Sequence, residues 1–216
     1  MMRTFRERGG EVVVAGDGRA DSPGHCAKYG VYSLIDMNSG QVIGLHIVQS
    51  CILHFQSNEV KLSYNIDLEG LKRAVSALNG AGINILEIIT DRHMQIQKWI
   101  RENMPFTVHS FDVWHIAKGV KKKLLSLAKE KDCQDVSRWI KSITNHLYWT
   151  AASCNKGDSD LMESKWKSVS SHVQNIHHGH QGPYKECQHD LLQDRVWLKP
   201  GKLAFLYNYY YLQLTL

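Results

Sequence analysis

Hydrophobic and polar residues alternate in the first part of the chain, first with the period of strands and then with that of helices. Strand-like runs cover 11–15, 28–37 and 41–49, and Asn38-Ser39-Gly40 between the last two runs is typical of a hairpin turn. Apolar residues at helical spacing then predict a helix over 66–78. The same spacing rules predict the remaining elements of this part: a strand over 83–90, a helix marked by 94–100, a strand over 106–111 and a helix marked by 116–127.

This order of strands and helices is typical of an α/β protein with a ribonuclease-H-like fold, in which three antiparallel strands precede two parallel strands with crossover helices. Past residue 131 the apolar spacing is mainly helical. The predicted organisation is a loose N-terminal lead-in over 1–10, a ribonuclease-H-like core over 11–131, a helical insertion-like region over 132–200 and an atypical apolar tail over 201–216. The apolar stretch Cys51–Phe55 is expected to extend the third strand or to form a small insertion.

Three of the predicted strands are followed by an aspartate: Asp17, Asp91 and Asp112. Residues just past the carboxyl ends of parallel strands line the crevice where open α/β sheets bind ligands, so these acids suggest one shared site. Converging carboxylates repel one another unless a cation lies between them, and Mg²⁺ is held by carboxylate oxygens, waters and substrate phosphates. Two such ions stabilise the attacking and leaving oxygens of a phosphodiester displacement. We therefore predict Asp17 and Asp91 as ligands of Mg²⁺ or Mn²⁺, although a single aspartate of this kind is often only a turn former.

Two positions compete for the third place in this site. Glu69 lies in the first turn of the helix between the third and fourth strands, where it could ligate metal or could simply be an acid favoured by the helix dipole. Asp112 and His115 could instead place an acid and an imidazole at the end of the fifth strand. Both options stay open.

The formal net charge is +5, and the positive charge is concentrated in one segment. Residues 92–131 contain nine Lys or Arg and three Asp or Glu. A basic stretch after acidic strand ends is compatible with a bound polyanion, although solvated helix charges are the simpler explanation. The nucleic-acid-binding candidates are Arg92, Lys118, Lys121, Lys122 and Lys123.

The cysteines and histidines indicate a reducing compartment and do not form a standard metal-binding motif. The five cysteines are widely spaced and never form Cys-x-x-Cys, which argues against a zinc ribbon. His177, His180, Cys187 and His189 offer zinc ligands, but their spacing fits no standard pattern, so we expect surface histidines and no zinc. The tryptophans at helical spacing are interpreted as packing residues before base-stacking ones: Trp114, Trp139, Trp149 and Trp166.

The chain shows no run of about 20 apolar residues and no apolar segment of a signal peptide. We therefore expect an intracellular protein without membrane association.

The segments Asp17–Gly30, Thr90–His93 and Phe111–Gly119 resemble the catalytic domain of DDE transposases, in particular the Kolobok and Mutator-like transposases of animal genomes, over about residues 11–200. The resemblance implies a nuclear protein that carries out metal-dependent DNA cleavage and strand transfer. Asp17 matches the first catalytic acid, Asp91 the second, and Asp112 with His115 the Asp-x-x-His element. The third acid of this family lies further downstream, on a helix after an inserted helical region.

Glu163 and Glu186 are the nearest candidates for that third acid, and neither lies in the family's motif. One expectation is therefore a truncated and inactive catalytic core. The alternatives are a non-catalytic DNA-binding or assembly module and a ribonuclease-H-type hydrolase that uses Asp17, Glu69 and Asp91. A homo-oligomer is left open.

Overall fold

The computed structural model describes residues 10–22, 28–49, 65–155, 157–190, 192 and 194–199. The predicted apolar insert and the predicted tail lie outside the described residues, as does the predicted lead-in apart from Gly10. The chain forms two compact units that divide between Asp112 and Val113. The predicted core boundary at residue 131 stays a prediction.

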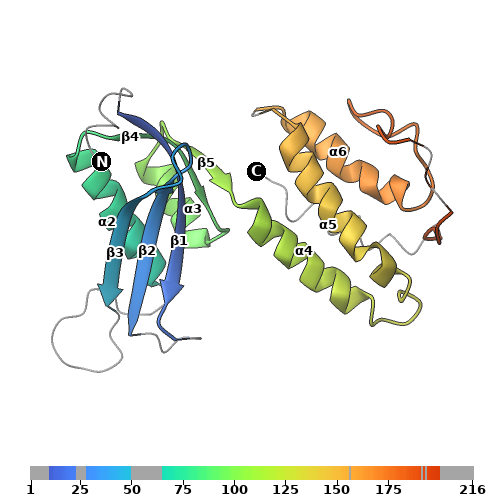
Figure 1. Ribbon diagram of the computed structural model, residues 1–216, viewed down its shortest axis with the longest axis horizontal. Helices are drawn as coiled ribbons and strands as arrows, with labels where there is room; N and C mark the ends of the chain where they lie inside the picture. The colour runs from blue at the N-terminus through green and yellow to red at the C-terminus, as the bar shows by residue number, and fades with distance from the viewer. Residues whose placement is uncertain are drawn as a thin grey trace. The chain divides into compact units, whose positions relative to one another are not determined.

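The first unit is built on a mixed five-stranded sheet with the strand order β3-β2-β1-β4-β5 (Figure 1). Its strands are β1 (Glu11–Ala20), β2 (Tyr29–Asp36), β3 (Val42–Gln49), β4 (Asn84–Thr90) and β5 (Val108–Phe111). The first three strands pair antiparallel, whereas β4 pairs parallel with β1 and with β5. This sheet confirms the predicted α/β class, and its order is compatible with a ribonuclease-H-like fold.

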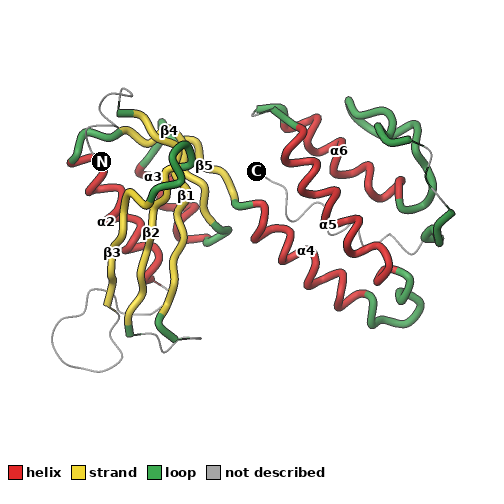
Figure 2. Tube along the Cα trace, viewed as in Figure 1, coloured by secondary structure: helices red, strands yellow, loops and turns green. Residues whose placement is uncertain are grey.

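Two helices cover one face of this sheet, α2 (Ile66–Gly80) and α3 (Met94–Asn103) (Figures 1 and 2). Alternate strand residues point toward these helices, as the period of a strand requires. The resulting core joins strand residues to both helices, and its members include Val14, Leu34, Ile88, Leu71, Val75, Ile96 and Ile100. The apolar spacing seen in the sequence therefore marks the buried side of each element.

Glycines allow α2 to approach the sheet closely. A Cβ atom added at Gly70 would lie 2.3 Å from Tyr32 Cβ, and one added at Gly30 would overlap the Ile66 side chain. Any larger residue at these positions would have to push the helix away from the strands.

The opposite face of the sheet carries apolar side chains that are exposed: Ile35, Leu45, Ile47, Leu86 and Val108. On the same face Ser110 Oγ donates a hydrogen bond to the Oε1 atom of buried Glu87 at 2.7 Å. This bond helps to satisfy a carboxylate that would otherwise be costly to bury.

The second unit is helical. It contains α4 (Val113–Leu127), α5 (Val136–Ser153) and α6 (Ser159–His172), with α4 packed on α5 and α5 on α6 (Figure 1). The predicted stripe of α4 is buried at Ile116, Val120, Leu124 and Leu127. None of the helices in the described part of the chain is long and apolar enough to span a membrane.

Candidate acidic site and histidine-cysteine cluster

The parallel pairing of β1 with β4 brings two predicted site residues to the same level of the sheet. Ala15 pairs with Ile89, and both Asp17 and Asp91 lie two residues further along their chains. Strand β1 is longer than the predicted strand over 11–15, because it continues past Asp17 to Ala20 and pairs there with β2. Asp17 therefore marks the end of the parallel pairing and not the end of the strand.

A third carboxylate comes from the first turn of α2. A Cβ atom added at Gly18 would overlap the Asp67 carboxylate, so this acid lies directly against β1. Burial is the main cause that raises the pKa of Asp67; His93 acts in the opposite direction, and Asp91 and Asp17 add to the rise. Asp67 is thus close enough to Asp91 and Asp17 to be influenced by their charges.

Tyr32 lies in the same acidic environment. Its side chain is fully buried, and burial followed by the charges of Asp67, Asp91 and Asp17 raises its pKa, so the phenol stays protonated at neutral pH. Its hydroxyl has no hydrogen-bond partner among the described residues. A buried donor without a partner is rare in folded proteins and is a sign that a ligand or water completes the site.

His93 adds a second polar atom of this kind. It precedes α3, and its Nδ1 atom is buried without a partner in the described structure. Because His93 also influences the pKa of Asp67, it belongs to the same site.

The carboxylate oxygens of these acids are suitable ligands for a hard cation, but they do not form a closely spaced group of ligand atoms. In the described part of the chain, the only group of three or more ligand side chains with all donor atoms within 4.8 Å is a histidine-cysteine cluster of the second unit. By strand alternation Asp17 points to the face opposite that of Gly18 and Asp67, which accounts for the wider spacing. Mg²⁺ needs only one or two protein carboxylates beside its waters, and its binding by Asp17 and Asp91 stays a prediction.

Glu69 lies outside this group. Arg73 Nε donates to Glu69 Oε1 at 2.9 Å, and Arg73 Nη1 donates to the carbonyl oxygen of Ile47 at 3.3 Å. The acid of α2 that lies against β1 is Asp67, and a metal-binding role for Glu69 stays a prediction.

The predicted Asp-x-x-His element divides between the two units. Asp112 follows β5, and its backbone N–H donates to the carbonyl oxygen of Thr90 at 2.8 Å. His115 lies on the first turn of α4, where its ring meets that of Trp114 edge to face, with the centroids 4.7 Å apart. Joint action of Asp112 and His115 stays a prediction.

The basic candidates are accessible on α4. Lys118 and the run Lys121–Lys123 are exposed, and Lys118 Nζ lies 4.9 Å from the ring centroid of Trp114. The predicted packing role is wrong for Trp114, which is 51 % exposed, and is confirmed for Trp139 and Trp166, which are buried. In the first unit, the Arg92 guanidinium lies 5.6 Å from the ring centroid of Phe111.

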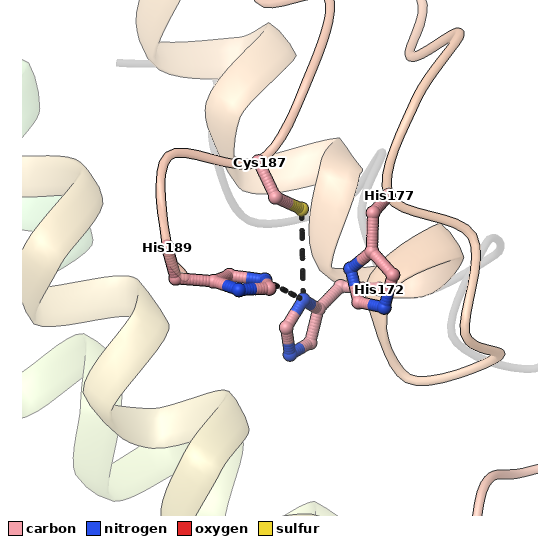
Figure 3. A group of neighbouring side chains, drawn as sticks. All are labelled: His172, His177, Cys187 and His189. Carbon is pink, nitrogen blue, oxygen red and sulfur yellow. Dashed lines mark hydrogen bonds between the residues drawn. The ribbon is translucent and has the colours of Figure 1, made fainter. Parts of the chain in front are cut away.

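The histidine-cysteine cluster consists of His172, His177, Cys187 and His189 (Figure 3). His172 comes from the last turn of α6 and the others from the loop that follows it. Burial, followed by the neighbouring His189 and His177, lowers the pKa of His172 to about 4, so its ring is neutral at pH 7. This convergence corrects the expectation of unrelated surface histidines.

The membership of the cluster also differs from the four zinc ligands considered in the sequence. His172 takes the place of His180, which is buried beside Cys187 instead. The signal that could have found His172 is the spacing His172-x₄-His177, which lies within the range known for zinc-binding histidine pairs.

No family model matches the sequence, and no curated protein matches it. The fold and the geometry of the two groups of side chains are therefore what support a function.

Proposed function

We propose that the first unit is a nucleic-acid-processing core that cleaves phosphodiester bonds with divalent metal ions, in the manner of DDE transposases. The observation that carries the proposal is that the charges of Asp67, Asp91 and Asp17 all act on the buried hydroxyl of Tyr32. This group lies where the parallel strands β1 and β4 end their pairing, in a sheet compatible with a ribonuclease-H-like fold.

The strand acids would hold the metal. Asp17 and Asp91 supply hard oxygen ligands. Burial is the main cause of the raised pKa of Asp67, and a bound cation would relieve the smaller contribution that comes from the charges of Asp91 and Asp17. When bound, Mg²⁺ supplies the positive charge that stabilises the attacking and leaving oxygens of the phosphodiester.

Two other side chains, Asp67 and Tyr32, would hold a proton and donate a hydrogen bond. Asp67 holds a proton more readily than an exposed carboxyl does, because burial raises its pKa. The Tyr32 hydroxyl stays protonated and can donate a hydrogen bond to a bound phosphate or water. Neither role requires a change in the backbone.

The exposed lysines of α4 supply attraction for the nucleic-acid backbone. Such contacts are independent of sequence and weaken as salt rises. We propose DNA as the polymer, on the basis of the resemblance to transposases.

A ribonuclease-H-type hydrolase is the second candidate, and the position of Asp67 favours it. The helix between the third and fourth strands supplies an acid to the site, so the set Asp17, Asp67 and Asp91 is complete without an acid further along the chain. The natural substrate would then be the RNA strand of an RNA–DNA hybrid.

The test combines binding of Mg²⁺ by calorimetry with cleavage of labelled DNA duplexes and RNA–DNA hybrids by the full chain. We expect Asp17→Asn and Asp91→Asn to reduce cleavage by more than about 100-fold, since even residues outside the ligand shell contribute 10–100-fold. Glu102→Gln, which changes an exposed acid on α3, serves as the matched control and should behave as the wild type.

The outcomes separate the candidates. Cleavage of the hybrid alone favours the hydrolase, and cleavage of the DNA duplex favours the transposase-like core. Binding of DNA that falls on substitution of Lys121–Lys123 by alanine, without cleavage of any substrate, leaves the non-catalytic binding module. Equal Mg²⁺ binding by the wild type and both folded aspartate variants contradicts the proposed metal site.

A further inference from the structure

Two atom pairs of the histidine-cysteine cluster have the spacing of a tetrahedral metal site. His189 Nε2 lies 3.3 Å from His172 Nδ1, and Cys187 Sγ lies 3.6 Å from the same nitrogen (Figure 3). Zinc bonds are about 2.0–2.1 Å long to nitrogen and about 2.3 Å long to sulfur. In a tetrahedral site these bond lengths place two nitrogens about 3.3 Å apart, and a nitrogen and a sulfur about 3.6 Å apart. These two separations match the edges expected for a shared ion, and all four ligand atoms lie within 4.8 Å of one another.

We propose that His172, His177, Cys187 and His189 bind one zinc ion and that this ion is a structural element of the second unit. Three imidazoles and one thiolate are a soft and intermediate donor set, which selects zinc over Mg²⁺ or Ca²⁺. Four protein ligands close the coordination shell, as in structural and not catalytic zinc sites.

Hydrogen bonds outside the cluster orient two of the rings for this role. His189 Nδ1 lies 2.7 Å from the carbonyl oxygen of Asp190, to which it donates, so Nε2 keeps its lone pair for the cluster. His177 Nε2 lies 3.0 Å from Asn175 Oδ1, and the opposite nitrogen, Nδ1, is buried without a partner in the described structure. Ligating histidines usually hold their second nitrogen in this way.

A cluster joined only by hydrogen bonds would satisfy these atoms less well. One N–H of His172 could serve either His189 Nε2 or Cys187 Sγ, and His177 Nδ1 would remain without a partner. A shared cation satisfies all the donor atoms at once, which is why we favour the metal site.

The sulfur of Cys187 is also contacted by a histidine outside the cluster, His180. His180 Nε2 lies 3.3 Å from Cys187 Sγ, and the His180 ring is buried and stacked on Tyr184, with centroids 5.7 Å apart and planes within 3° of parallel. A ring N–H donated to the sulfur fixes the Cys187 side chain in position beside the cluster. His180 is therefore a positioning residue for the site.

The backbone brings the ligands together without an ion. The N–H of Cys187 donates to the carbonyl oxygen of His177 at 2.9 Å, and His178 forms an isolated antiparallel bridge with Glu186. Asn175, with φ of 65°, turns the chain after α6 toward this hairpin. Zinc would fix the hairpin to the end of α6.

The test uses the purified full chain. We expect one zinc per chain after dialysis, and, after exchange with Co²⁺, the strong visible bands of tetrahedral cobalt together with a sulfur-to-cobalt charge-transfer band. Cys187→Ser should abolish the charge-transfer band, and Cys187→Ser and His189→Ala should each weaken zinc binding by more than about 100-fold. His189 is exposed, so its variant stays informative if Cys187→Ser does not fold.

Two control variants match these changes. His178→Ala alters an exposed histidine of the same hairpin, and Cys154→Ser alters a free thiol elsewhere in the second unit; both should retain one zinc per chain. His180→Phe keeps the ring but removes the N–H, and should weaken zinc binding 10–100-fold. A folded wild-type chain that takes up no zinc, or zinc binding by His189→Ala equal to that of the wild type, would overturn the proposal.

Discussion

The buried hydroxyl of Tyr32 gives a sharp test of whether the acidic site is built to receive a ligand. The Tyr32 side chain is 1 % exposed, and its hydroxyl has no partner in the described structure. A buried polar group left unsatisfied costs about 1–3 kcal/mol of folding free energy. We therefore expect Tyr32→Phe to raise the free energy of unfolding of the ligand-free chain by about 1–2 kcal/mol, because the packed ring is kept and only the unpaired oxygen is removed.

The same substitution should impair function. If the hydroxyl donates to a bound phosphate or water, its loss removes one hydrogen bond to the ligand, and substrate binding should weaken by about tenfold. A gain in stability with a loss of function is typical of a site that carries strain for its ligand.

Tyr184→Phe is the matched control. Tyr184 is buried in the second unit, but its hydroxyl forms a hydrogen bond with the backbone of Gln188. Removing a satisfied hydroxyl should lower the free energy of unfolding by about 1 kcal/mol, which is the opposite sign.

Urea unfolding followed by circular dichroism measures both changes, with the slope of the transition as a check that the unfolded state is unaltered. Equal losses of stability in Tyr32→Phe and Tyr184→Phe would show that the Tyr32 hydroxyl is already satisfied, and the argument for a ligand at this position would fail.

Two further predictions concern the same unit. Burial raises the pKa of Asp67, so the folded chain gains stability as pH falls through that pKa. Asp67→Asn should therefore be more stable than the wild type at pH 7. This difference in stability should vanish well below pH 3.8, where the carboxyl of the unfolded chain is also protonated. In α2, Gly70→Ala should lower the free energy of unfolding in urea by about 1–2 kcal/mol, because overlap with Tyr32 outweighs a gain in helix propensity of about 1 kcal/mol. Gly80 has open space around it, so Gly80→Ala should not lower the free energy of unfolding. A stable Gly70→Ala chain would mean that α2 can move away from the sheet.

The fold could be predicted because its signals are local and agree with one another. The hairpin turn at Asn38–Gly40, the alternation in β2 and the helical spacing of α2 each involve few neighbouring residues. The extent of β1 was underestimated, because Gly16 and Gly18 look like loop residues in the sequence. In the structure they are strand positions that Tyr32 and Asp67 overlie, a contact between distant segments that a local pattern does not contain.

The candidate sites could be predicted only in part, for the same reason. Asp17 and Asp91 are conspicuous in the sequence as acids after apolar runs, and the parallel register places them at one level of the sheet, while their role as metal ligands stays a prediction. The sequence does not single out Asp67, because an acid in the first turn of a helix is already explained by its favourable interaction with the helix dipole. His172 was missed because it lies on a helix whose end meets the hairpin only in three dimensions.

The two groups of ligands differ in chemistry as well as in position. The acids of the first unit are hard oxygen donors, whereas the cluster of the second unit offers imidazole nitrogens and a sulfur. Because metals sort by donor softness, Mg²⁺ and Zn²⁺ should bind to different units, and the aspartate variants should leave zinc content unchanged. The two proposals can therefore fail separately. A chain that holds zinc and binds DNA, but neither binds Mg²⁺ nor cleaves nucleic acid, would be a binding module whose helical unit is stabilised by metal.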